Sequence, residues 1–134
     1  MKIHGSCHCG DITFEAEVDP EQVVVCHCTD CQTLSGSAYR TVAPALVGSY
    51  KLLSGSPKTY IKTAQDGTKR AQVFCPECGT PIYSGPAGEE STRVGIRVGT
   101  LRERDQLPPR KQVWCGSAQD WVQDLSSITK IVSH

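Results

Sequence analysis

Three cysteines lie within one short stretch of the chain, at Cys26, Cys28 and Cys31. Three thiolates from a single loop can hold a metal ion and leave its fourth coordination position free. A zinc ion with four protein ligands is structural, whereas one with three protein ligands keeps a position for water or substrate. The trio therefore predicts an open zinc site, where a substrate thiolate or a polarised carbonyl oxygen can bind.

Four of the other cysteines form two close pairs, Cys7 with Cys9 and Cys75 with Cys78, while Cys115 stands apart. Tight clusters of this kind are typical of metal sites in a cytosolic protein, whereas disulfide frameworks scatter their cysteines. We therefore expect metal binding and not disulfides. Cys115 is expected to be a small buried hydrophobic residue; the rival reading is a fourth ligand to the open site.

Two groupings of these cysteines into metal sites fit their spacing. One joins the two pairs in a closed site with four thiolates and leaves the trio as an open site. The other joins the N-terminal pair with Cys26 and Cys28, and leaves Cys31 with the C-terminal pair. The first grouping is more economical, because it keeps the compact trio on one ion.

Two histidines, His8 and His27, each lie between two cysteines. On an extended segment the middle side chain points away from its neighbours, so neither histidine is expected to be a ligand. The sequence assigns no general base. Besides His27, the candidates near the trio are Asp30 and Tyr39.

The segments on either side of the trio predict how it is positioned. The apolar run 23–25 indicates a short buried strand that ends at the first cysteine. Residues 29–35 are expected to form a helical turn, with Thr29 or Asp30 as its N-cap and Gly36 at its C-terminal end.

Further short strands are expected along the rest of the chain. Residues 12–18 alternate between apolar and polar, as in a half-buried strand. The runs 59–63 and 68–74 flank Asp66-Gly67, which is a strong hairpin signal, and residues 86–90 read as a polar loop. Many short strands without a long helical period predict a mainly β protein.

Alternation over residues 94–98 predicts one more strand, in which Gly95 and Gly99 would allow close backbone approach. Trp114 and Trp121 are expected in the core or where the domain closes, because large rings contribute much of the buried apolar area.

Length and charge restrict the class of protein. With 134 residues the chain is expected to be one domain over 1–134. Its 14 basic and 14 acidic residues cancel, which gives no argument for a nucleic-acid partner. No apolar run approaches the ~20 residues of a membrane span, and the N-terminus lacks an apolar signal segment. We therefore expect a cytoplasmic protein without a membrane partner.

The cysteine motifs, in this order, resemble the glutathione-dependent formaldehyde-activating enzymes, a family that shares a domain with centromere protein V. The similarity runs over nearly the whole chain. The set and order of motifs is specific, although any one of them alone would be weak. The matching stretches are residues 5–10, 26–31, 35–37, 74–80 and 98–101, and Trp121.

This resemblance implies a β-tent built of small antiparallel sheets tied by zinc knuckles, with two Zn²⁺ ions per chain. It also implies carbon–sulfur lyase chemistry, the reversible addition of a small thiol such as glutathione to formaldehyde or another aldehyde. It assigns a structural zinc to Cys7, Cys9, Cys75 and Cys78, and the open zinc to Cys26, Cys28 and Cys31.

At two positions the chain departs from the family pattern. Gln112 stands where many members have histidine, and Gln32 stands where a basic residue is common. Three functions therefore stay open. They are a zinc-dependent carbon–sulfur lyase resembling S-hydroxymethylglutathione synthase, a non-catalytic zinc-stabilised module that binds a protein partner, and a thiol-based zinc or redox sensor.

Overall fold

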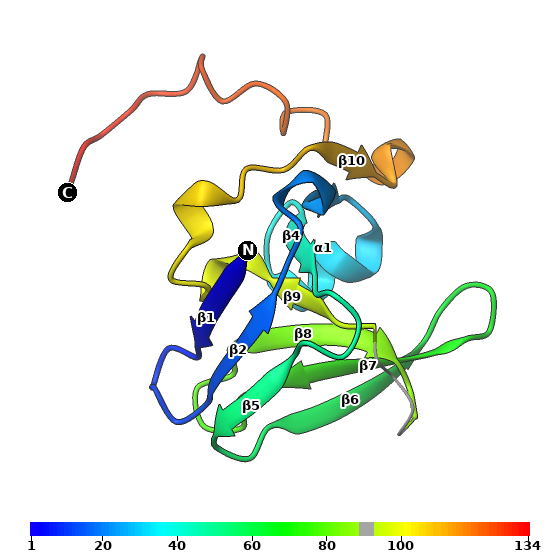
Figure 1. The fold of residues 1–134 in the computed structure, drawn as a ribbon. Coiled ribbons are helices and arrows are strands. Elements are labelled where there is room, and N and C mark those ends of the chain that lie inside the picture. The colour runs from blue at the N-terminus through cyan, green and yellow to red at the C-terminus, as the bar shows by residue number, and fades with distance from the viewer. Residues whose placement is uncertain (89–92) are drawn as a thin grey trace.

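The computed structural model describes residues 1–88 and 93–134, and these residues form a mainly β structure, as predicted (Figure 1). A three-stranded antiparallel sheet has the order β1-β2-β5, with β1 at Lys2–Ser6, β2 at Thr13–Glu17 and β5 at Lys51–Ser54. A seven-stranded sheet has the order β10-β3-β4-β9-β8-β7-β6. Its strands are β3 (Val24–Cys26), β4 (Arg40–Pro44), β6 (Lys58–Thr63), β7 (Lys69–Phe74), β8 (Pro81–Pro86), β9 (Gly95–Arg97) and β10 (Lys111–Val113). The one α-helix of the described residues is α1 (Thr29–Ser35).

The strand β10 lies at the edge of the larger sheet and runs parallel to β3, with Val113 opposite Cys26. All other strand pairs in the two described segments are antiparallel. Parallel strands need a long connection, and most of the chain lies between β3 and β10. The result is that a late segment of the sequence is held beside the first cysteine of the trio.

The core lies where the small sheet packs against the middle of the large one. Tyr50 connects the two, because its ring centroid lies 5.4 Å from that of Phe14 in β2 and 4.8 Å from that of Tyr83 in β8. Fully buried aliphatic side chains surround these rings, from Ile3 in β1 to Ile96 in β9. This core fixes β1, β7 and β8, and therefore the loops that carry both cysteine pairs.

Most local predictions agree with the structure. β6 and β7 form the expected hairpin, and Gly67 in its turn has a φ of 87°. β2 falls within the expected strand 12–18. The strand expected over 94–98 is shorter, because residues 98–100 form a 3-10 helix. Of the loop expected over 86–90, Pro86 belongs to β8, and Glu89 and Glu90 lie outside the described residues.

The two glycines predicted to allow close backbone approach differ in how closely other atoms surround them. A Cβ on Gly95 would lie 2.9 Å from Val42 Cγ1, so this prediction is confirmed. A Cβ on Gly99 would meet nothing within 4 Å, so that prediction is wrong. The difference follows from the end of β9: Gly95 is paired between β4 and β8, whereas Gly99 has left the sheet.

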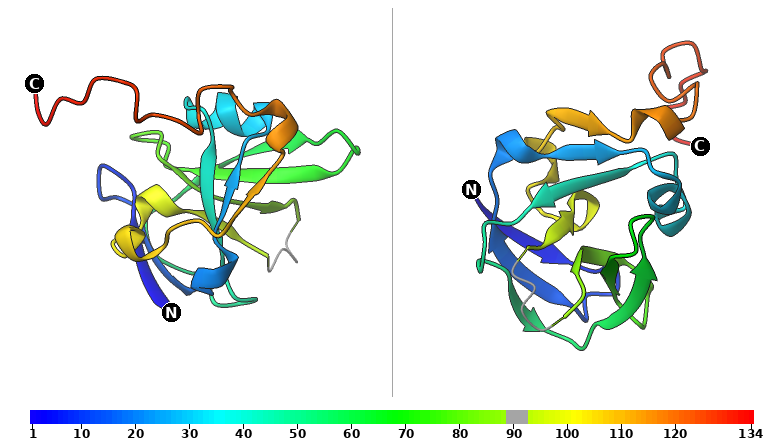
Figure 2. Two further views of the ribbon diagram at one scale, coloured as in Figure 1. Left: turned by 90° about the horizontal axis from the view of Figure 1, so that it is seen from above. Right: turned by 90° about the vertical axis from the view of Figure 1, so that its right-hand side faces the viewer.

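The prediction that the tryptophans lie in the core is wrong, because Trp114 is 58% exposed and Trp121 is 54% exposed. Trp114 follows the edge strand β10, whose three residues are all exposed, and the aliphatic core is complete without either ring. After Trp121 the chain runs away from the sheets as an exposed tail, which the two further views also show (Figure 2).

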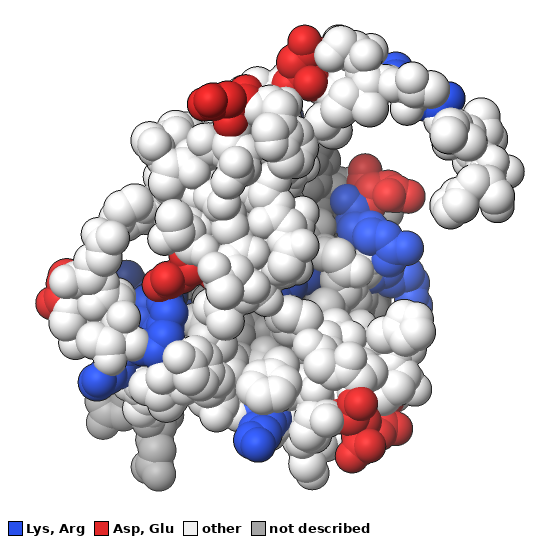
Figure 3. Space-filling view, turned by 180° about the vertical axis from the view of Figure 1, so that it is seen from behind, with Lys and Arg blue, Asp and Glu red and all other residues white. Residues whose placement is uncertain are grey.

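Charged side chains are scattered over the surface. On the face seen from behind, Lys and Arg lie in separate places with Asp and Glu between them, and no large patch of one sign forms there (Figure 3). In the described part of the chain, no helix is both long enough and apolar enough to span a bilayer.

Replacing Gly5 by alanine is expected to destabilise the fold by about 2–3 kcal/mol, because the core cannot accept extra volume without shifting. Gly5 lies opposite Phe14 in the β1–β2 pair, and an added Cβ would collide with the Phe14 ring. Thermal unfolding measures the loss. Gly99→Ala is the matched control, and equal melting temperatures for the two variants would contradict this account of the core.

Candidate metal centres

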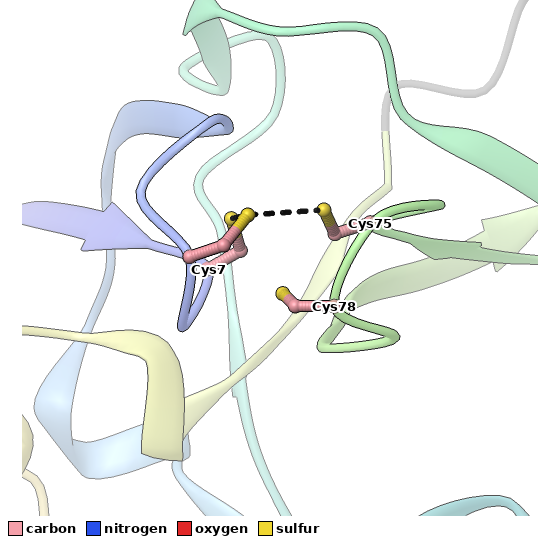
Figure 4. Close-up of side chains that lie close together, drawn as sticks. Cys7, Cys75 and Cys78 are labelled. Carbon is pink, nitrogen blue, oxygen red and sulfur yellow. Dashed lines mark hydrogen bonds between the residues drawn. The ribbon is translucent and has the colours of Figure 1, made fainter.

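Four cysteine sulfurs from two loops that are distant in the sequence meet at one place. They all lie within 4.8 Å of one another. Figure 4 shows the side chains of Cys7, Cys75 and Cys78 pointing toward a common centre, from the loop after β1 and the turn after β7. The Sγ of Cys9 lies 3.6 Å from that of Cys7 and 3.8 Å from that of Cys75. We call this group the four-cysteine cluster.

Backbone geometry shapes both loops for this meeting. In the second loop the Gly79 N–H donates to the Cys75 carbonyl at 2.8 Å, and Gly79 has a φ of 80°, which glycine adopts without strain. Thr80 connects the loops: its Oγ1 accepts from the His8 N–H at 3.1 Å and lies 3.2 Å from Cys78 Sγ. Sequence reasoning missed Thr80; its place directly after the knuckle glycine is the signal that could have found it.

The spacing of these sulfurs fits a coordinated ion. Four sulfurs at about 2.3 Å from one zinc in a tetrahedron lie ~3.8 Å apart, which agrees with the observed 3.6 and 3.8 Å. A disulfide would need a separation of about 2.05 Å. The cysteines are free thiols, and the hydrogen bond to Thr80 lowers the pKa of Cys78 to about 5, which favours the ionised, ligating form.

The trio forms a second cluster, the three-cysteine cluster, around the start of α1. The sulfurs of Cys26, Cys28 and Cys31 lie within 4.8 Å of one another. Cys28 Sγ accepts from the Cys31 N–H at 3.2 Å and is the N-cap of α1. The prediction that Thr29 or Asp30 caps this helix is therefore wrong. The helix begins after the extended Cys28, which leaves Asp30 free to pair with Lys62 at 2.9 Å.

Ionisation of one thiol of the trio opposes ionisation of its neighbour. The hydrogen bond to Cys31 lowers the pKa of Cys26 to about 5. The same contact raises the pKa of Cys31, because the negative Cys26 opposes a second charge beside it. A divalent cation would remove this conflict, so the donor set fits a thiophilic ion such as Zn²⁺.

The segment from β10 to the following turn holds the loop that carries the trio. The His27 N–H donates to the Val113 carbonyl at 3.0 Å. The His27 carbonyl accepts from Gln32 Nε2 at 2.8 Å and from Ser117 Oγ at 3.0 Å. Three hydrogen bonds therefore hold this loop, two of them from Val113 and Ser117, and the positions of the sulfurs do not depend on a metal ion alone.

Neither histidine joins a cluster. The His27 ring is buried and donates from Nε2 to Gln112 Oε1 at 2.7 Å, on the side of the loop away from the sulfurs. His8 is exposed. Cys115 is also exposed and belongs to neither cluster, so the prediction that it is buried is wrong. It follows Trp114, where the left-handed backbone turns the chain outward after β10.

The three-cysteine cluster opens into a cleft of about 1130 Å³, whereas no residue of the four-cysteine cluster lines that cleft. Residues of the hairpin β6–β7 line it, and so do Trp114 and Ser117. Asp30 lines the cleft, but the other candidate proton-transfer groups, His27 and Tyr39, do not. The two clusters therefore differ in their surroundings: the four-cysteine cluster ties two loops together, and the half-buried three-cysteine cluster lines a cleft.

Residues 2–117 match the family described as "Glutathione-dependent formaldehyde-activating enzyme". The chain belongs to this family. In a crystal structure, a Rhodobacter sphaeroides protein has a similar fold with a TM-score of 0.61 and 21% identity, over 84% of this chain and 99% of that one. A sequence comparison with curated proteins finds no match. Membership places the chain in an enzyme family whose description names glutathione and formaldehyde as substrates.

Both departures from the pattern of the formaldehyde-activating family have structural roles here. Gln32 Nε2 also donates to the Ser117 carbonyl at 2.9 Å, and its Oε1 accepts from Gln119 Nε2 at 2.8 Å. Gln112 Oε1 accepts from His27 and, at 2.7 Å, from Gln123 Nε2. Both glutamines join the loop of the trio to the C-terminal segment.

Proposed function

We propose that this protein is a zinc-dependent carbon–sulfur lyase that catalyses the reversible addition of a small thiol, such as glutathione, to formaldehyde. In this proposal the four-cysteine cluster holds a structural Zn²⁺ and the three-cysteine cluster holds an open one. The family supports the substrates, and the accessible cleft beside the three-cysteine cluster supports the place of reaction.

The observation that carries the proposal is the difference between the two clusters. The open cluster has three sulfurs, and no fourth Cys, His, Asp or Glu of the described residues joins it. Zinc bound there would supply a position for a thiolate and would polarise an aldehyde oxygen. The closed cluster already has four sulfurs and no opening to the cleft.

The protein's own residues contribute by holding the two reactants in position. Adduct formation joins the thiol sulfur to the carbonyl carbon, while the thiol loses a proton and the carbonyl oxygen gains one. The cleft brings the two reactants together, and orientation of this kind supplies much of the rate gain in such reactions. Asp30 and Lys62, paired at 2.9 Å on the cleft wall, are the groups placed to exchange that proton with solvent.

The test is formaldehyde consumption that requires both glutathione and the zinc-loaded protein, measured above the spontaneous rate. We expect a rate that saturates with glutathione and that Cys115→Ser retains, because Cys115 lies outside both clusters. A rate equal to the spontaneous one with every thiol tried would refute the lyase and favour a non-catalytic module. Reversible zinc release by a mild oxidant would instead support the sensor.

A further inference from the structure

Two arginines are buried in the wall of the cleft that holds the three-cysteine cluster. Arg40 is 5% exposed and Arg97 is 8% exposed. Both guanidiniums donate to the same atom, Gln72 Oε1, Arg40 from Nη1 at 3.2 Å and Arg97 from Nη2 at 3.0 Å. The Nε atom of each arginine is buried and has no partner within residues 1–88 and 93–134.

This arginine pair lacks the opposite charge that buried cations normally have. A buried charge is usually matched by an opposite charge, because its desolvation is costly. Across the described parts of the chain neither guanidinium forms an ion pair, and the nearby Asp30 is taken by Lys62. Burial, followed by the charge of Arg40, lowers the pKa of Arg97 to about 9, so the Arg97 guanidinium is still cationic at neutral pH.

The three-cysteine cluster does not account for this positive charge. Three thiolates around one divalent ion carry one net negative charge, whereas the two guanidiniums carry two positive charges. The other charged side chains of the cleft cancel, because the half-buried Arg70 interacts with Asp66 and Lys62 is paired with Asp30. An excess of positive charge therefore stays in the cleft when the ion is bound.

The residue that joins the pair belongs to the wall of the cleft. Arg40 and Arg97 also border a second hollow on the molecule, but Gln72, which their Nη atoms contact, lines the cleft and not that hollow. Because Gln72 Oε1 is a neutral acceptor shared by two cations, their other N–H groups remain available to a ligand in the cleft.

We propose that Arg40 and Arg97, bridged by Gln72, form an anion site that binds a carboxylate of the thiol substrate, so that the cleft selects negatively charged thiols over neutral ones. Guanidinium groups suit this task because their N–H groups match the two oxygens of a carboxylate. The identity of the ligand as a thiol rests on the proposed function; the anion site itself rests on the buried pair.

Binding of S-methylglutathione tests the site without the reaction, because this ligand keeps both carboxylates and has no free thiol. In zinc-loaded Trp121→Phe protein, Trp114 is the single tryptophan and lines the cleft, so its fluorescence reports binding. We expect the dimethyl ester of S-methylglutathione to bind at least about tenfold more weakly. Equal binding of acid and ester would overturn the anion site, and equally strong competition by inorganic phosphate would overturn its assignment to a carboxylate.

Gln72→Glu places a carboxylate where both guanidiniums already donate. We expect this variant to have a higher melting temperature and an affinity for S-methylglutathione at least about tenfold lower, because the internal anion replaces the ligand. Gln106→Glu is the matched control, since Gln106 is exposed and lies outside the cleft. Unchanged affinity in folded Gln72→Glu would overturn the proposal. If this variant does not fold, the comparison of S-methylglutathione with its dimethyl ester still tests the anion site, because it leaves the residues of the site unchanged.

The two proposals fail in different ways. If S-methylglutathione binds through its carboxylates but formaldehyde is never consumed, the lyase is refuted and the anion site stands. If formaldehyde is consumed equally fast with glutathione and with its diester, at the same KM, the anion site is refuted and the lyase stands.

Discussion

Replacing Cys78 by serine is expected to leave the protein largely unfolded. The four-cysteine cluster joins the loop after β1 to the turn after β7, and the contact between Cys9 and Cys75 spans 66 positions of the chain. In the proposed function this cluster holds zinc, and structural zinc supplies on the order of 10 kcal/mol of folding free energy. That is comparable to the whole net stability of a small domain. The rest of the fold therefore cannot compensate for the free energy lost when the cluster has one ligand fewer.

Soluble yield, thermal unfolding by circular dichroism and zinc content per chain measure this effect. Cys115→Ser is the control, because it removes an exposed thiol outside both clusters. We expect two zinc ions and an unchanged melting temperature in the control. A Cys78→Ser protein that melts like the parent, beside a Cys31→Ser protein that is unfolded, would show that the assignment of the structural and open sites is reversed.

Local signals in the sequence predict the elements that their own residues determine. Asp66-Gly67 forms the β6–β7 turn because the two residues suit a tight turn between alternating strands. The run 23–25 gives β3, which ends at Cys26, and Gly36 ends α1 in a left-handed conformation. The tight spacing within each cysteine group is local as well, and the structure gathers the same groups of sulfurs that the more economical grouping joined.

Features that depend on long-range packing were not predictable in this way. The bond from Gln32 to Ser117 spans 85 positions, and the bonds from Gln72 to Arg40 and Arg97 span 32 and 25. Nothing in the neighbourhood of these residues in the sequence marks them as partners. The same reason explains the error on Trp114: ring size favours burial, but the parallel pairing of β10 at a sheet edge places the residue outside the core.

Replacing Cys31 by serine is expected to abolish formaldehyde consumption and to leave the fold intact. The trio closes only a short loop, which Gln32, Ser117 and Val113 also hold through hydrogen bonds to His27. We therefore expect the melting temperature to fall by no more than about 5 °C, while the rate falls to the spontaneous one. This variant separates the two clusters, because losing a thiolate from the cleft affects chemistry and losing one from the four-cysteine cluster affects stability.

Cobalt substitution gives this prediction a readout other than activity, because the d–d absorption of Co²⁺ reports its coordination. Glutathione added to the parent protein should change the spectrum of one cobalt equivalent, the one at the three-cysteine cluster, and leave the other unaltered. The change should persist in Cys115→Ser and vanish in Cys31→Ser. A parent spectrum that no thiol or aldehyde alters would mean that the second site is already closed, and a closed site cannot receive a substrate sulfur. The lyase would then be refuted, and the cleft would have to serve binding alone.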